Sequence, residues 1–206
     1  MNFAEEYLEE TKKVLARLDH SVIEKMVTLL ADLRERGGRL FFLGVGGGAA
    51  ASSHAVSDFR TIAGIESYTP ADNVTELTAG INDHGWDSIF AEWLRESSLN
   101  PRDGIFVFSV GGGDAARGIS SNIVEALNYA RKTGTLILGV VGRDGGYTAR
   151  VADACLVIPT VNPRRVTPHT EALQALVSHL IVSHPKLKIS EMKWESENGP
   201  RLKTKH

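Results

Sequence analysis

The sequence LFFLGVGGG at residues 40–48 decides the fold class. Its first part is a continuous apolar run, which is typical of a strand buried on both faces of a parallel sheet. Its second part is rich in glycine and leads into the helical pattern of residues 49–63. A buried strand, a glycine turn and a helix in direct succession predict the first unit of an α/β fold.

Similar apolar runs and helical patterns alternate along the rest of the chain. The apolar runs lie at residues 105–109, 135–141 and 155–159, and further helical patterns lie at residues 86–97, 120–132 and 148–152. This alternation predicts a three-layer, doubly wound α/β fold, in which helices flank a parallel sheet.

Helices are also expected at both ends of this core. Apolar residues recur at helical spacing through residues 3–33, which predicts two N-terminal helices before Gly37. Near the other end, Thr167 is placed to cap a last helix, with Pro168 at its first position and Pro185 as its stop.

The chain has no linker long enough to divide it, so a single domain is expected. The parts of this domain are an N-terminal helical pair at residues 1–37, an α/β core at residues 38–185 and a polar, basic tail at residues 186–206. Trp194 is the expected apolar anchor of the tail.

Charge and composition limit the classes of function. The 206 residues carry 23 Lys and Arg against 25 Asp and Glu, a net charge of −2 with neutral histidines, so the basic excess typical of nucleic-acid binding is missing. No long apolar run is present, and the acidic Glu5 and Glu6 replace the basic start of an export signal. We expect a cytoplasmic protein that binds neither nucleic acid nor membrane. Cys155, the only cysteine, lies in an apolar run and is expected to be buried and inert.

Glycine-rich loops follow three of the expected strands. They read GVGGG at residues 44–48, SVGGGD at residues 109–114 and GRDGG at residues 142–146. Such loops lie at the carboxyl edge of a parallel sheet, where ligands bind, and their free N–H groups can hold an anion. One such loop is as often a plain turn as a site, but three at equivalent strand ends favour a ligand.

Two acid and histidine pairs lie on expected helices. His54 and Asp58 are four residues apart and share a helix face, so both can reach a metal or a substrate hydroxyl, although surface pairs of this kind are common. Glu171 and His179 face broadly the same way, two turns apart. Since apolar residues surround His179 in the sequence, these neighbours alone favour a core histidine at that position.

The order of these features resembles the phosphoheptose isomerases, which have the sugar isomerase (SIS) fold. The features are the first glycine loop, the His54 and Asp58 pair, the segment NDHGW at residues 82–86, the GRDGG turn and the late His179. The resemblance covers residues 1–185. It implies a zinc-binding homotetramer with active sites shared between subunits. It also implies conversion of D-sedoheptulose 7-phosphate to D-glycero-D-manno-heptose 7-phosphate through an enediolate, for the surface heptose of lipopolysaccharide.

The resemblance also implies site residues. His54 matches a zinc-ligating His, Asp58 a catalytic and metal-binding Glu, Glu171 a Gln ligand and His179 a catalytic and ligating His. The implied metal ligands are therefore His54, Asp58, Glu171 and His179, of which Asp58 and His179 are catalytic. The implied substrate contacts are Gly46, Gly47, Gly48, Asp83, Ser109, Ser120, Ser121 and Glu171.

Both phosphate loops depart from the family pattern. Val45 and Gly48 replace an Asn and a Ser in the first loop. In the second loop, a gapless match places Asp114 where its charge would repel a phosphate. An insertion of about six residues would instead restore Ser120 to a helix N-terminus, and we prefer this alignment. Arg143, Arg164 or Arg165 could add positive charge.

Two other functions stay open from the sequence. One is a regulator with the SIS fold that binds a protein or a phosphosugar without catalysis, and the other is an isomerase of a different phosphosugar. The presence of both acid and histidine pairs favours an enzyme over the regulator.

Overall fold

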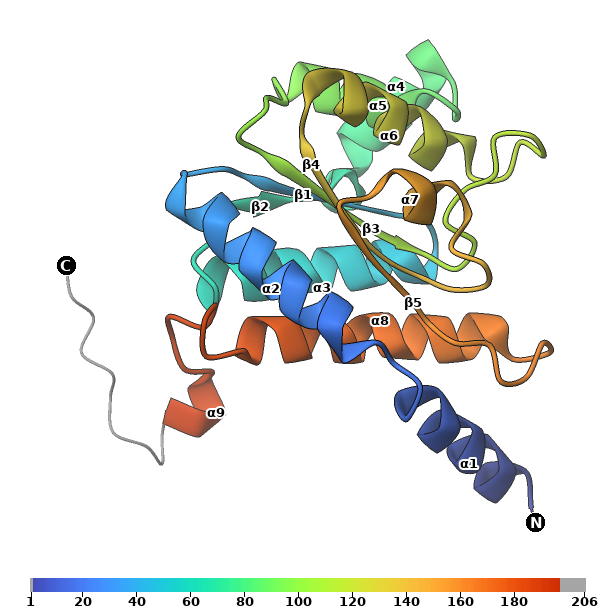
Figure 1. Ribbon diagram of the computed structural model, residues 1–206. Coiled ribbons are helices and arrows are strands. Elements are labelled where there is room, and N and C mark those ends of the chain that lie inside the picture. Colours follow the sequence, from blue (N-terminus) through green and yellow to red (C-terminus); the bar gives the residue numbers. More distant parts are fainter. Residues whose placement is uncertain (1, 197–206) are drawn as a thin grey trace.

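The computed structural model describes residues 2–196 and contains a five-stranded parallel sheet between two helix layers (Figure 1). The sheet order is β2-β1-β3-β4-β5. The strands are β1 (Leu40–Gly44), β2 (Ser67–Tyr68), β3 (Gly104–Ser109), β4 (Leu136–Val141) and β5 (Ala154–Val157). The predicted doubly wound α/β fold is confirmed. Only β2 was missed among the strands, because a two-residue edge strand is too short to leave a pattern.

One helix layer consists of α2 (His20–Glu35), α3 (Gly47–Thr61) and α8 (Val166–Ser183). Helix α1 (Phe3–Leu15) comes before α2 in the chain. Three phenylalanines on this face of the sheet, Phe42, Phe106 and Phe108, pack together with ring centroids 5.0 to 5.8 Å apart. Phe59 of α3 packs edge-on against Phe42. Each buried ring contributes about 1.5–3 kcal/mol through the hydrophobic effect.

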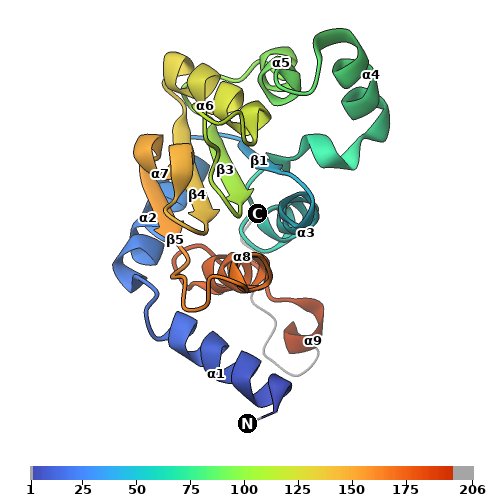
Figure 2. The same cartoon turned by 90° about the vertical axis from the view of Figure 1, so that its right-hand side faces the viewer.

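The opposite layer consists of α4 (Val74–His84), α5 (Ile89–Glu96), α6 (Ser121–Thr133) and α7 (Gly146–Val151) (Figure 2). Here the core contains the alternate strand residues, among them Phe41, Leu43 and Ile105. Because successive side chains of a strand point to opposite faces, two separate cores explain why the strands are continuously apolar.

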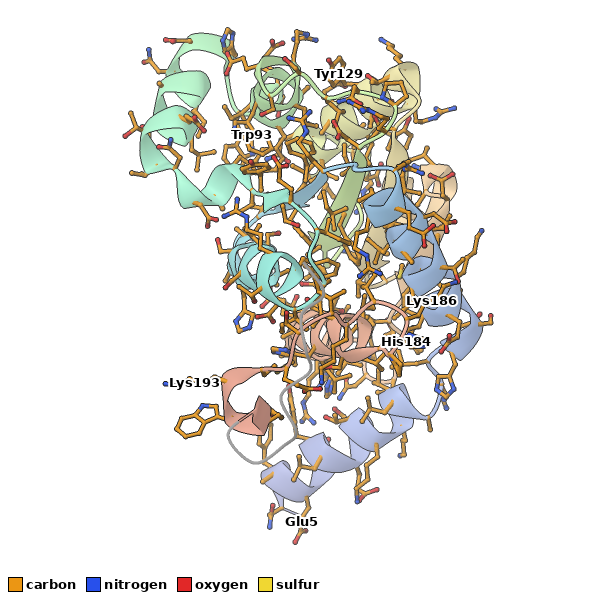
Figure 3. All side chains as sticks on the ribbon, turned by 90° about the vertical axis from the view of Figure 1, so that its left-hand side faces the viewer. Glu5, Trp93, Tyr129, His184, Lys186 and Lys193 are labelled. Carbon is orange, nitrogen blue, oxygen red and sulfur yellow. The ribbon has the colours of Figure 1, made fainter. Side chains whose placement is uncertain are left out.

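Residues at the C-cap of α8 and just after it make polar contacts with α2. The His184 imidazole lies 3.3 Å from the Glu24 carboxylate, and Lys186 Nζ donates to Thr28 Oγ1 at 3.1 Å (Figure 3). Leu187, which follows, is fully buried. Trp194, in the short helix α9 (Lys193–Ser196), is 75% exposed, so the expectation that it anchors the tail was wrong.

The start of α8 differs from the expectation, and α4 was not expected. The N-cap of α8 is Arg165 and the helix begins at Val166, so Thr167 is not the cap and Pro168 lies within the first turn. Proline is accepted throughout that turn because the first N–H groups of a helix have no partner within it. Helix α4 was missed, although Asn73 caps it by accepting from the N–H groups of Thr75 and Glu76. It follows a 3₁₀ turn, η1 (Pro70–Asp72).

Two further findings concern the expected setting. No helix within residues 2–196 combines the length and the apolar character that crossing a bilayer requires. Cys155 is half-buried rather than fully buried, and burial raises the pKa of its thiol to about 12. Since the thiolate is the reactive form, this environment supports the expectation of an inert cysteine.

The carboxylate of Glu10 makes the largest set of polar contacts between helix α1 and the rest of the domain. Its oxygens accept from Asn162 Nδ2 at 2.7 Å and from Arg165 Nη1 at 3.1 Å, and His169 Nε2 lies 3.1 Å away. The Tyr7 ring stacks on His169 at 4.5 Å. The hydrogen bonds from Asn162, His169 and Arg165 lower the pKa of Glu10 to about 2.

This network predicts an acid-sensitive contribution to stability. The folded pKa of Glu10 lies below its ordinary value of 4.5, so the contribution is complete above about pH 4.5 and is lost as the pH falls toward 2. Glu10→Gln should lower the melting temperature at pH 7, and the gap to wild type should narrow as the pH falls from 5 to 3. Glu9→Gln, which alters an exposed pair with Lys12, is the control. A gap that stays constant with pH in thermal denaturation would contradict the assignment.

Candidate functional site

The glycine loop after β1 sets α3 directly on the sheet. A Cβ on Gly44 would meet the Gly48 carbonyl oxygen at 2.3 Å, and a Cβ on Gly48 would meet the Phe108 carbonyl oxygen at 2.4 Å. Gly46 has a φ of +60°, in the left-handed region that favours glycine. Glycine is therefore required at these positions for α3 to pack on the sheet. The loop also fixes the position at which α3 begins.

Two turns into α3, three side chains converge. His54 Nε2 lies 3.2 Å from Asp58 Oδ2, and His179 Nδ1 on α8 lies 3.3 Å from the same oxygen. The two imidazole rings meet edge to face, with centroids 5.0 Å apart. The interpretation of His179 as a core histidine was wrong, because its side chain is 48% exposed.

The donor set of His54, Asp58 and His179 fits a transition metal. One ligand atom from each residue lies within 4.8 Å of the others. Asp58 Oδ2 is buried and makes no hydrogen bond, although two ring nitrogens approach it. Such an oxygen is costly to leave without a partner. Two imidazoles and a carboxylate, open to solvent on one side, match the three protein ligands of catalytic zinc sites.

Glu171 does not join this cluster in the structure. Its carboxylate lies over Gly47 at the start of α3, where an added Cβ would meet the Glu171 carboxylate at 2.4 to 2.5 Å. Glu171 and His179 are eight residues apart, which corresponds to a rise of about 12 Å along α8. The structure thus brings together three of the four expected ligands and places the fourth at the glycine loop.

Most of the expected substrate contacts lie at the carboxyl edge of the sheet. Ser109 ends β3, and its Oγ accepts from the Gly112 N–H at 3.0 Å. Ser120 precedes α6 with a φ of +52°, and Ser121 is the first residue of that helix. Asp83, by contrast, is exposed on α4, where it accepts from the Asn82 side chain at 2.8 Å, and it does not reach the cluster of His54.

The second loop contains a small hairpin that supports the insertion alignment. Asp114 and Ile119 form an antiparallel bridge. Asp114 Oδ1 accepts from the N–H groups of Ala116 and Arg117 at 3.0 and 3.1 Å, within the hairpin. These hydrogen bonds of Asp114 therefore stay within the hairpin. Ser120, which follows the hairpin directly, is the N-cap residue of α6.

The arginines that could add positive charge toward the phosphate have different surroundings. Arg165 is engaged by Glu6 and Glu10 at 3.2 and 3.1 Å. Arg143 lines two surface clefts, one together with Arg117 and Arg150 and the other with Arg164. Arg117 and Arg150 could not be identified from the sequence, because they come from a loop and a short helix with no shared spacing.

The cluster predicts metal binding that depends on the histidines. A His54→Ala/His179→Ala variant should lose nearly all zinc, whereas Glu171→Ala should keep it, because the Glu171 carboxylate lies at Gly47 instead. His20→Ala/His84→Ala, which removes two exposed histidines elsewhere, is the matched control. Metal analysis of protein purified without chelator measures each content. Equal zinc in wild type and in the first variant would refute the site.

Comparison with known proteins extends these observations. A family model described as SIS domain matches residues 6–142. The phosphoheptose isomerase of Chlorobium phaeobacteroides is 34% identical over 160 residues, which cover 74% of this chain and 68% of that protein. The phosphoheptose isomerase of Chlorobaculum parvum is 31% identical, with 85% and 83% covered.

Solved structures show the same fold. The phosphoheptose isomerase of Neisseria gonorrhoeae superimposes with a TM-score of 0.74 over 87% of this chain and 95% of that one, at 20% identity. The matched SIS model covers β1, β3 and β4 with the glycine loops between them. From the sheet, the loops and these relatives together, the chain belongs to the phosphoheptose isomerase family of SIS-domain proteins.

Proposed function

We propose that this protein is an isomerase that converts D-sedoheptulose 7-phosphate to D-glycero-D-manno-heptose 7-phosphate, for the synthesis of surface heptose. The observation that carries the proposal is the convergence of His54, Asp58 and His179 in a chain whose relatives are named phosphoheptose isomerases. A regulator that only binds a phosphosugar would not require two imidazoles beside one buried carboxylate oxygen.

The reaction moves a proton between two neighbouring sugar carbons through an enediolate. This needs a base beside the carbon and a positive group beside the developing oxyanion. Asp58 is the base, and His179, whose Nδ1 lies 3.3 Å from Asp58 Oδ2, carries the proton to and from the sugar oxygen. A zinc ion held by His54, Asp58 and His179 would supply Lewis acidity toward that oxygen. Because Asp is one methylene shorter than Glu, the sugar must lie close to α3.

The phosphate end of the substrate is best accommodated at the start of α6. Ser120 and Ser121 supply hydroxyl and N–H groups there, and Ser109 lies at the end of the neighbouring strand. The start of α3 at Gly46, Gly47 and Gly48 is also open to an anion, but the Glu171 carboxylate already lies over Gly47. Two anions at one helix end repel each other, which favours α6 for the phosphate.

Loss of one hydroxyl should weaken the binding of substrate. Ser120→Ala should raise KM for sedoheptulose 7-phosphate by about tenfold, as expected for a hydrogen bond to a charged group, and should leave zinc content and melting temperature unchanged. Ser183→Ala, at an exposed position at the end of α8, is the control. If Ser120→Ala is silent while Asp114→Ala abolishes turnover, the gapless alignment is correct.

A measurement of turnover distinguishes the isomerase from a regulator that only binds a phosphosugar. Asp58→Asn should reduce kcat by two or more orders of magnitude, in the range expected for loss of an acid or base, while the variant still binds the phosphosugar. Wild-type protein that binds the phosphosugar but never converts it would favour the regulator.

We also propose that the protein assembles as a homotetramer. Phe3 and Leu8 of α1 are exposed, as are Leu176 and Leu180, which flank His179 on α8. A second copy packed there would cover apolar surface and close the open side of the cluster, and Asp83 would reach a sugar bound in a neighbouring subunit. Sedimentation equilibrium should show a tetramer at micromolar concentration, and Leu176→Glu/Leu180→Glu should shift it to smaller species. Monomeric wild-type protein would refute the shared site.

A further inference from the structure

Helix α8 carries two buried polar side chains, Gln174 and Ser178, just before His179. Gln174 is fully buried, and Ser178 is 4% exposed. Among residues 2–196, four side-chain atoms are buried without a hydrogen-bond partner, and two of them are Gln174 Oε1 and Ser178 Oγ. Since a buried polar atom is costly to leave without a partner, this pair marks a place where a small polar molecule is held.

The amide of Gln174 links α8 to the sheet. Its Nε2 donates to the carbonyl oxygen of Val140 in β4 at 3.1 Å, and within residues 2–196 no other side-chain hydrogen bond joins α8 to a strand. Because a carbonyl oxygen only accepts, the nitrogen end of the amide must face Val140, and the oxygen end is left without a donor. The apolar contacts of α8 have no preferred direction, so this bond fixes how α8 lies along β4.

The hydroxyl of Ser178 differs from the other helical hydroxyls of the chain. Six Ser and Thr hydroxyls in the helices, among them that of Ser52 in α3, donate to the carbonyl oxygen four residues earlier at 2.7 to 3.0 Å. The Ser178 hydroxyl makes no such bond. It is therefore available to a group outside its own helix.

Helix geometry places Ser178 toward α3. Ser178 follows Glu171 by seven residues, almost two whole turns, and the Glu171 carboxylate lies over Gly47 of α3. Helices α3 and α8 lie side by side (Figure 2). On the same face of α3, the positions four and eight residues after Gly47 are Ala51 and Ala55, whose side chains are small. The Cβ atoms of residues four apart on a helix, such as Gln174 and Ser178, are about 5–6 Å apart, a separation that one water molecule bridges.

We propose that Gln174 and Ser178 hold one buried water molecule where α8 meets α3 and β4, and that both are positioning residues for His179. A water molecule both donates and accepts, so it donates to Gln174 Oε1 and accepts from the Ser178 hydroxyl. These two anchors, one of them directly before His179, fix the backbone of α8 where the imidazole approaches Asp58. The inference rests on the proposed metal site and assigns residues that support it.

Zinc affinity, measured on the full chain by competition with a chromophoric chelator, tests the positioning role. Ser178→Ala and Gln174→Met should each weaken zinc binding by about tenfold, as expected when a metal ligand loses its support. The double variant should bind no more weakly than the weaker single variant, because both changes remove the same water. Ser67→Ala, which removes a fully buried hydroxyl in β2, is the control and should bind as wild type does. The visible spectrum of bound Co²⁺, which reports ligand geometry, should change only in the α8 variants.

The sign of the change in melting temperature gives a second measurement, without metal. Removal of a hydroxyl that has no partner stabilises a protein, whereas removal of one that holds a water molecule destabilises it. Ser178→Ala should therefore lower the melting temperature of the metal-free protein. A rise would overturn the proposal, as would unchanged zinc affinity and Co²⁺ spectra in both variants, or additive losses in the double variant.

A crystal structure of the metal-free protein tests the water directly. We expect electron density for one water within hydrogen-bonding distance of both Gln174 Oε1 and Ser178 Oγ. A Ser178 hydroxyl bonded to the Gln174 carbonyl, with no water beside it, would refute the site. The result does not depend on whether the protein is an isomerase, so failure of this inference is distinguishable from failure of the proposed function.

Discussion

The close contact of the glycine loop with the sheet is the constraint on which the site depends. Gly44 and Gly48 have no room for a side chain, so α3 begins directly on the carboxyl ends of β1 and β3. From that fixed start, the helical repeat brings His54 and Asp58 to the outer face of α3, one turn apart. Helix α8 packs beside α3, which puts His179 within 3.3 Å of Asp58. Three side chains from two distant segments thereby meet on two packed helices.

A carboxylate also lies against the same glycine loop. The Glu171 carboxylate lies over Gly47, at the end of α3 where the backbone N–H groups carry partial positive charge. The polar residues of α3 and α8 thus form two groups along one helix pair, a carboxylate at the start and the imidazoles two turns later. A neutral Gln at position 171 would leave the start of α3 with a different electrostatic character.

The sequence predicted the fold well because both faces of the sheet are buried. A strand covered on both sides must be apolar throughout, and this pattern identified β1, β3, β4 and β5. It could not identify β2, which has only two residues. The His54 and Asp58 pair was predictable from helical spacing, but spacing alone does not say which helix packs beside α3. Helical spacing also does not give the direction of a long side chain. For this reason Glu171 was expected among the metal ligands, whereas its carboxylate lies over Gly47. The three arginines of the cleft meet only in the folded chain and share no period.

Helix α4 has a consequence for the dynamics of the molecule. Among its residues none is fully buried, and it packs chiefly on α5 and η1. A hydrogen bond from Trp93 Nε1 to Glu76 and the Asn73 cap are its main polar attachments (Figure 3). Elements with so little buried surface open more readily than the core. The amide hydrogens of α4 should therefore exchange with solvent deuterium well before those of α3, so that Asp83 sits on a part of the chain that can rearrange while the histidine cluster stays in place.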